Sequence, residues 1–105
     1  LPKVDAIVDR ASLIALPFEL RKIYYQQIIE LTSSGSKILL ITLNYDSPSE
    51  MGPPFSISKD EIYHHYQAFF KINILEHLET ENIPLKLIEN NITKVNQDIY
   101  WLEKI

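Results

Sequence analysis

The chain has 105 residues, which is enough for one small domain and too few for two. Apolar residues make up 46% of it, so a core can form, and a net charge of −4 without a basic cluster argues against a nucleic-acid partner. Because the chain has no cysteine, we exclude disulfides. It has no signal peptide and no apolar run of roughly 18 residues, so we expect a cytoplasmic protein without a membrane partner.

The first predicted strand covers residues 4–8 and ends at Asp9 and Arg10. The apolar segment 11–16 after it is typical of a helical turn or a tight connection. An arginine at the end of a strand can bind a carboxylate or stack on an aromatic ligand. From the residues alone, an ion pair with Asp9 or with Asp46 is the favoured alternative.

A helix is predicted next, with Pro17 at its first position, where the missing N–H is not needed. Apolar side chains recur at three- and four-residue spacings and predict one buried helix face. They are Leu20, Ile23, Tyr24, Ile28 and Leu31. We expect the segment 33–36 to end this helix, with Gly35 as a left-handed cap.

Residues 38–43 form an almost unbroken apolar run that ends before Asp46. A strand that is apolar on both sides is typical of parallel α/β sheets, in which both faces are covered. The order of strand, helix and apolar strand predicts a βαβ unit with a right-handed crossover. Such sheets bind ligands beyond the carboxyl ends of their strands, so we expect a site near the loop at 46–57.

Capping and alternation signals predict the remaining elements. Residues 58–61 form a capping box that begins a short helix, which ends at about Tyr66. Alternating side chains predict a half-buried strand at 69–77, and 99–102 is predicted to be the last strand. The segment 85–95 is ambiguous apart from a turn at its two consecutive asparagines. We expect the sheet order first strand, central strand, last strand, strand 69–77, with the last strand antiparallel to its neighbours.

The segment Gly52-Pro53-Pro54-Phe55 lies in the predicted exit loop. Two prolines reduce the flexibility of a loop, which suits a segment that forms a pocket wall. The alternative is a rigid connection whose phenylalanine packs into the core. The residues alone leave both readings open.

Glu61, His64 and His65 lie on the predicted short helix, and His77 follows later. Three histidines without another ligand cluster are a weak metal signal, and a solvated helix face explains them better, so we predict no metal site. Asp60 and Glu61 are a weaker acid–base candidate, because the capping role already accounts for Glu61.

Several blocks of the sequence resemble the thiopurine S-methyltransferase family when they are taken together. They are Asp9 to Pro17, Glu19 to Arg21, Thr42 to Asp46, Gly52 to Ser56 and Asn96 to Leu102. The resemblance spans nearly all of the chain, but it covers only the C-terminal half of the family's domain. It implies the C-terminal half of a Rossmann-like class I methyltransferase fold, with a mixed sheet and an antiparallel closing pair.

By this resemblance, the family transfers a methyl group from S-adenosylmethionine to a small-molecule thiol, or in bacteria also to selenium or tellurium compounds. Arg10 would lie near both cofactor and acceptor, and Pro54 and Phe55 would line the acceptor pocket. The family also has a basic residue, usually arginine, before its last strand. Lys86 lies near that place, although a lysine cannot make the same bidentate contact.

The family's glycine-rich cofactor loop and its ribose-binding acidic residue are absent, and Gly35 and Gly52 are the only glycines. We therefore expect residues 1–105 to be a single partial domain that lacks the N-terminal cofactor-binding half and is inactive alone. The alternative is a non-catalytic module that docks a partner or self-associates. Without a neighbour, the first strand would expose its edge, which predicts self-association, as a homodimer through residues 4–9 or by exchange of an element.

Overall fold

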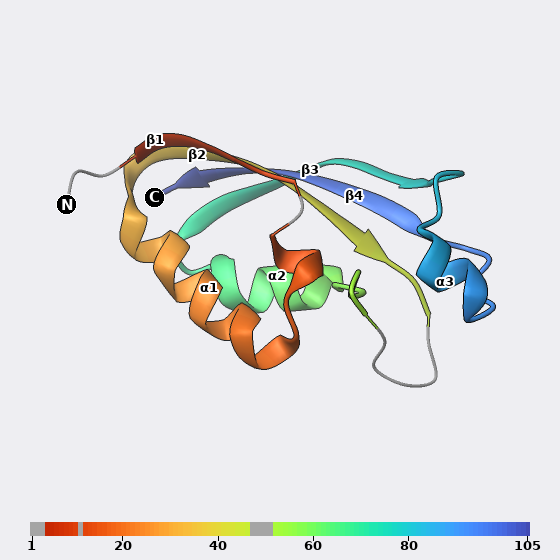
Figure 1. Cartoon of the computed structure of the whole chain (residues 1–105). Coiled ribbons are helices and arrows are strands. Elements are labelled where there is room, and N and C mark those ends of the chain that lie inside the picture. The colour runs from red at the N-terminus through yellow and green to blue at the C-terminus, as the bar shows by residue number, and fades with distance from the viewer. Residues whose placement is uncertain (1–3, 11, 47–51) are drawn as a thin grey trace.

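The computed structural model describes residues 4–10, 12–46 and 52–105 (Figure 1). Ala11 and residues 47–51 of the predicted exit loop lie outside the described residues. In chain order the elements are β1 (Val4–Asp9), the 3₁₀ turn η1 (Leu13–Ala15), α1 (Phe18–Leu31), β2 (Thr32–Asn44), α2 (Lys59–Tyr66), β3 (Phe70–Glu79), α3 (Leu85–Glu89) and β4 (Asn96–Lys104). No helix within these described ranges is long and apolar enough to cross a membrane.

The four strands form one mixed sheet in the order β1-β2-β4-β3. Strand β1 runs parallel to β2, with Ile7 beside Ile38, and β4 runs antiparallel to both β2 and β3. Both the strand order and the antiparallel last strand are thus confirmed. They follow from the βαβ unit, which fixes the first pair, and from the closing strand that inserts beside β2.

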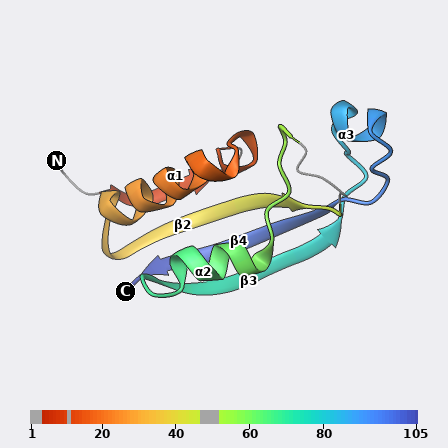
Figure 2. The ribbon, with the colours of Figure 1, turned by 90° about the horizontal axis from the view of Figure 1, so that it is seen from below.

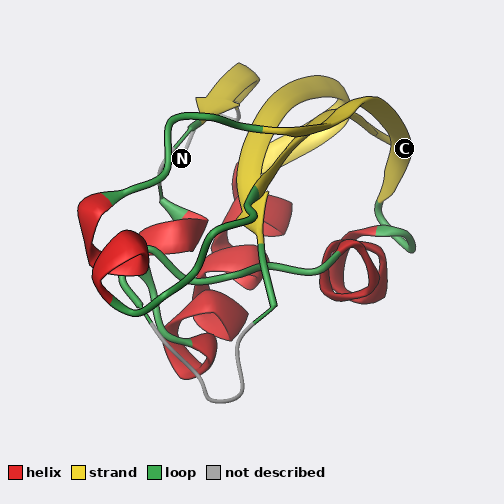
Figure 3. Ribbon diagram, turned by 90° about the vertical axis from the view of Figure 1, so that its right-hand side faces the viewer, coloured by secondary structure: helices red, strands yellow, loops and turns green. Residues whose placement is uncertain are grey.

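Helices α1 and α2 lie on the same side of the sheet (Figures 1, 2 and 3). The main core lies between these helices and the sheet, and it contains Leu13, Tyr25, Ile28, Ile38, Leu40, Ile57, Ile62, Tyr66, Phe70, Tyr100 and Leu102. On β2 the buried residues alternate with the half-buried Leu39, Ile41 and Leu43. Cover on both faces was expected, but within the described residues α1 and α2 cover only one.

Helix α3 lies beyond the ends of β2 and β3, where β4 begins (Figures 1 and 2). It closes a second, small core of Tyr45, Leu87, Ile92 and Val95, against which Leu43 and Ile83 pack. The ambiguous segment thus contains one short helix. The predicted turn is present, because Asn91 has a φ of 64° directly after that helix.

The buried face of α1 differs from the predicted one. Leu20, Ile23 and Leu31 are 49%, 58% and 37% exposed, whereas Arg21 and Tyr25 are buried beside Ile28. Arg21 was not among the residues predicted to be buried, and its charge has a buried partner, described below. The helix also begins one residue later than predicted, since Pro17 is its N-cap.

Gly35 has the predicted left-handed backbone, with a φ of 88°, but it does not cap a helix. Helix α1 ends at Leu31, and Gly35 lies inside β2, in the irregularity between the pairs Val4–Thr32 and Ala6–Lys37. The helix end is satisfied instead by the Lys104 ammonium, which donates to the carbonyls of Ile29 and Thr32 at 2.6 and 3.1 Å. The contact comes from the other end of the chain.

Replacing Gly35 by alanine should therefore lower the unfolding free energy by about 1–2 kcal/mol, the cost of a left-handed backbone for a residue with a Cβ. A Cβ at this position meets no atom within 4 Å, so the cost is conformational and not steric. Gly35→Asn is the matched control, because asparagine tolerates this conformation better and should lose less. Urea unfolding measures both, and equal stability of Gly35→Ala and the original chain would contradict the assignment.

Candidate functional site

Arg10 directly follows β1, at the edge of the sheet where β1 and β2 both end. Its side chain lines a cavity of about 240 Å³ together with Ile14, Ile41, Thr42, Leu43 and Gln97. This is the carboxyl edge of the parallel pair, where α/β sheets bind ligands.

The ion pair favoured by the residues alone is not formed. Asp9 is only 4% exposed, and its carboxylate accepts hydrogen bonds from the Tyr24 hydroxyl at 2.8 Å and from the Ser12 N–H at 3.3 Å. Arg10 is exposed and has no acidic partner among the residues that the structure describes. Its guanidinium is therefore available to a ligand.

Burial raises the pKa of Asp9, and the hydrogen bonds from Tyr24 and Ser12 oppose that rise. The pKa of Tyr24 is raised to about 12, mainly by burial, so its hydroxyl stays a donor at neutral pH. The buried Asp9 and the half-buried Tyr24 thus form a hydrogen-bonded pair beside the exposed Arg10.

The loop with the two prolines is hydrogen-bonded to η1 and to the residue that follows β2. The Phe55 N–H donates to the Ile14 carbonyl at 2.7 Å, and the Tyr45 hydroxyl donates to the Pro54 carbonyl at 2.7 Å. A Cβ on Gly52 would lie 2.5 Å from the Phe55 ring, which explains the glycine. Since Ile14 also lines the Arg10 cavity, the loop and the cavity share one wall.

Lys86, on α3, donates a hydrogen bond from its ammonium to the Gly52 carbonyl. The structure thus brings Lys86 to the same loop as Pro54 and Phe55, and the Phe55 N–H contacts Ile14, which lines the Arg10 cavity. The four predicted site residues lie around one end of the sheet. Their roles toward a ligand stay predictions.

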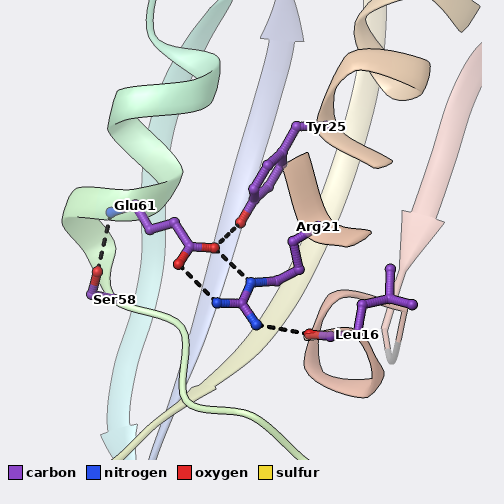
Figure 4. Close-up of polar contacts among 5 residues, drawn as sticks. All are labelled: Leu16, Arg21, Tyr25, Ser58 and Glu61. Carbon is purple, nitrogen blue, oxygen red and sulfur yellow. Dashed lines mark hydrogen bonds and ion pairs between the residues drawn. The ribbon is translucent and has the colours of Figure 1, made fainter. Parts of the chain in front are cut away.

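A buried ion pair beside this loop was missed in the sequence (Figure 4). The Arg21 Nε and Nη2 atoms donate to the two carboxylate oxygens of Glu61 at 2.8 and 3.1 Å, and Nη1 donates to the Leu16 carbonyl at 2.7 Å. The Tyr25 hydroxyl donates to Glu61 at 2.5 Å, and burial together with this contact raises the pKa of Tyr25 far above its ordinary value. These contacts tie α1, the end of η1 and α2 together.

The pair also corrects the reading of Glu61. The N-cap is as predicted, since the Ser58 hydroxyl accepts from the Glu61 N–H at 3.1 Å. The Glu61 side chain, however, faces Arg21 rather than the cap or His64. No local sequence signal identifies such a pair, because its partners are forty residues apart.

The histidines of α2 make aromatic contacts. The His65 ring stacks on Tyr25 with a centroid distance of 4.3 Å, and the His64 ring lies edge-on to His65 at 5.0 Å. Burial is the main cause of the lowered pKa of His65. In the described part of the chain, no group of three or more histidine or acidic residues is arranged to hold a metal ion.

A comparison with protein families identifies the family of this chain. The family model described as "Thiopurine S-methyltransferase" matches residues 1–105. This chain belongs to the thiopurine S-methyltransferase family. The resemblance drawn from the sequence blocks is thereby confirmed.

Individual relatives agree with the family match. The thiopurine S-methyltransferase of Vibrio atlanticus is 39% identical over 100 residues, which cover 95% of this chain and 46% of that protein. The thiopurine S-methyltransferase of Psychrobacter cryohalolentis is 51% identical over 74 residues, which cover 70% of this chain and 33% of that protein. The chain spans about half the length of such relatives, or less.

The crystal structure of TehB from Haemophilus influenzae has the same fold, with a TM-score of 0.67 over 100% of this chain and 37% of that chain. Sequence identity is 20%, so this likeness shows the fold alone. The expected class I methyltransferase fold, with a mixed sheet and an antiparallel closing pair, is confirmed.

Thiopurine S-methyltransferases use S-adenosylmethionine, and the described residues fit only part of a site for it. Arg10 and its cavity offer a free cation at the carboxyl edge. Neither glycine follows β1, since Gly35 lies in the first part of β2 and Gly52 packs against Phe55. The glycine at this edge, Gly52, is packed against the Phe55 ring, and no glycine follows β1 to allow a close backbone approach to a cofactor.

Proposed function

We propose that this chain is the acceptor-side half of a cytoplasmic, S-adenosylmethionine-dependent S-methyltransferase. Its acceptor would be a small thiol, or a selenium or tellurium compound, and the chain alone would be inactive. The carrying observation is the exposed guanidinium of Arg10, which has no acidic partner among the described residues and lies in a cavity at the carboxyl edge. Family membership supports the reaction type.

The chemistry of sulfur methylation gives these residues their proposed roles. The acceptor reacts best as a thiolate that is aligned with the methyl group, and a fixed cation beside it stabilises the negative charge. Arg10 would supply that cation and contact the cofactor. Pro54 and Phe55 would form a wall of the acceptor pocket, and Lys86 would contact the acceptor while it holds the loop at Gly52.

The test is Arg10→Ala in a complete methyltransferase, made by joining the amino-terminal half of a relative to this chain. Methyl transfer should fall by about 100-fold, the usual cost of removing one donor to a developing or reacting anion. The melting temperature should change little, because Arg10 is exposed and has no ion-pair partner among the described residues. Arg10→Lys keeps the charge but loses the planar fork, so its rate of methyl transfer should lie between those of the original enzyme and Arg10→Ala. Full activity of Arg10→Ala would show that the arginine has no role in the reaction.

A second function of a different class is a non-catalytic module that self-associates or docks a partner through the free edge of β1. The exposure of Val8, at 70%, favours it. Titration of S-adenosylmethionine into the joined methyltransferase and into its Arg10→Ala variant separates the two proposals. Weaker binding by Arg10→Ala supports the enzyme half, and equal binding by both supports the module.

A further inference from the structure

Asp9 and Arg10 are adjacent and oppositely charged, yet they do not pair. The buried Asp9 carboxylate accepts hydrogen bonds from the hydroxyl of the half-buried Tyr24 at 2.8 Å and from the N–H of the exposed Ser12 at 3.3 Å. Asp9 lies beside Leu40, which is on the buried face of the sheet. Arg10 follows the end of β1 and lines a cavity with β2 residues of both faces, Thr42 as well as Ile41 and Leu43.

We propose that Tyr24 is a positioning residue for Arg10, because its hydroxyl keeps the Asp9 carboxylate from neutralising the guanidinium. Arg10 then remains free for the anionic part of a ligand, such as an acceptor thiolate. This inference rests on the ligand-binding role proposed for Arg10. Tyr24 itself is not among the residues that line the Arg10 cavity.

The competition favours Tyr24 for a physical reason. An ion pair between exposed groups contributes little, because water screens it and the side chains lose entropy. A hydrogen bond to a buried carboxylate contributes more, since an unsatisfied buried charge is costly. Without the Tyr24 hydroxyl, Ser12 alone would satisfy Asp9, and Arg10 is the cation next to it in the chain.

Removal of the hydroxyl should therefore let Asp9 turn toward Arg10. In Tyr24→Phe of the 105-residue chain, solvent exchange of the Arg10 Nε–H should slow by about two- to fivefold, which corresponds to an exposed ion pair. The signal is measured by ¹H–¹⁵N NMR and assigned with Arg10→Lys. If pairing leaves a fifth of Arg10 free, the apparent affinity for an anionic acceptor falls about fivefold.

A double substitution separates positioning from a structural role. In Asp9→Asn/Tyr24→Phe no carboxylate is left to compete, so exchange at Arg10 should return to the original rate. The acceptor KM of the complete methyltransferase should recover in the same way, with kcat changed less. A structural role predicts that the double variant is no better than Tyr24→Phe. Tyr25→Phe is the matched control, because its hydroxyl binds Glu61 and not Asp9.

If Tyr24→Phe does not fold, Asp9→Glu gives a second test. Its longer side chain carries the carboxylate past the Tyr24 hydroxyl, and the same slowing of exchange at Arg10 is expected. Unchanged exchange at Arg10 in the folded variants overturns the proposal, as does slow exchange that persists in the double variant. Failure of the proposed function is a different result, namely full activity of Arg10→Ala, and it leaves the NMR outcome unaffected.

Discussion

Replacing Arg21 by methionine should lower the unfolding free energy of the chain by about 3–5 kcal/mol, because it leaves the Glu61 carboxylate buried without its cation. The side chains of Arg21 and Glu61 are 5% and 15% exposed, and two hydrogen bonds join them. The Leu16 carbonyl also loses its donor. Small domains have unfolding free energies of about 5–15 kcal/mol, so the loss is a large part of the total. Urea unfolding measures it.

Two further variants show whether the buried charge is the cause. In Arg21→Met/Glu61→Met no charge is left unpaired, so much of the stability should return. Lys22→Met removes the exposed pair with Glu19, whose atoms are 3.2 Å apart, and should cost less than about 1 kcal/mol. Equal losses in Arg21→Met and Lys22→Met would mean that the buried pair contributes no more than a surface one.

Local patterns together with the family resemblance were sufficient for the strand order, whereas local patterns were insufficient for α1. The strand order followed from the βαβ unit around the apolar run at 38–43 and from a hairpin-like closing pair, and the resemblance strengthened it. The buried face of α1 depends on Glu61, which lies forty residues after Arg21 and becomes its neighbour only in the folded chain. Gly35 shows the same limit, because its backbone conformation was predictable but the strand irregularity that uses it was not.

Some features of the site could likewise be predicted from the sequence and others could not. The end of β1 and the proline loop could be located, since both follow from strand ends and turn residues. Whether Arg10 pairs with Asp9 could not be decided, because the answer depends on a hydroxyl from the helix that follows. The contact of Lys86 with Gly52 likewise joins segments that are distant in the sequence.

The free edge of β1 leads to the last expectation, that the 105-residue chain self-associates at micromolar concentration. The strand order puts β1 at one edge, so its outer side pairs with no strand among the described residues. Val8 is 70% exposed and lies beside the half-buried Leu39, on the face that α1 and α2 leave open (Figure 1). An exposed apolar edge strand pairs readily with another chain, and a two-fold axis lets β1 pair with itself. Sedimentation velocity should show a dimer.

The opposite edge of the sheet supplies a matched control for this expectation. Val8→Lys places a charge on β1 and should give a monomer, because a lysine on an edge strand opposes pairing. Leu78→Lys makes the same change on β3, where the side chain is 58% exposed, and should leave the dimer intact. A folded monomer of the original chain would contradict self-association. If only Leu78→Lys separates the dimer, the chains associate through β3, and the edge of β1 is not the interface.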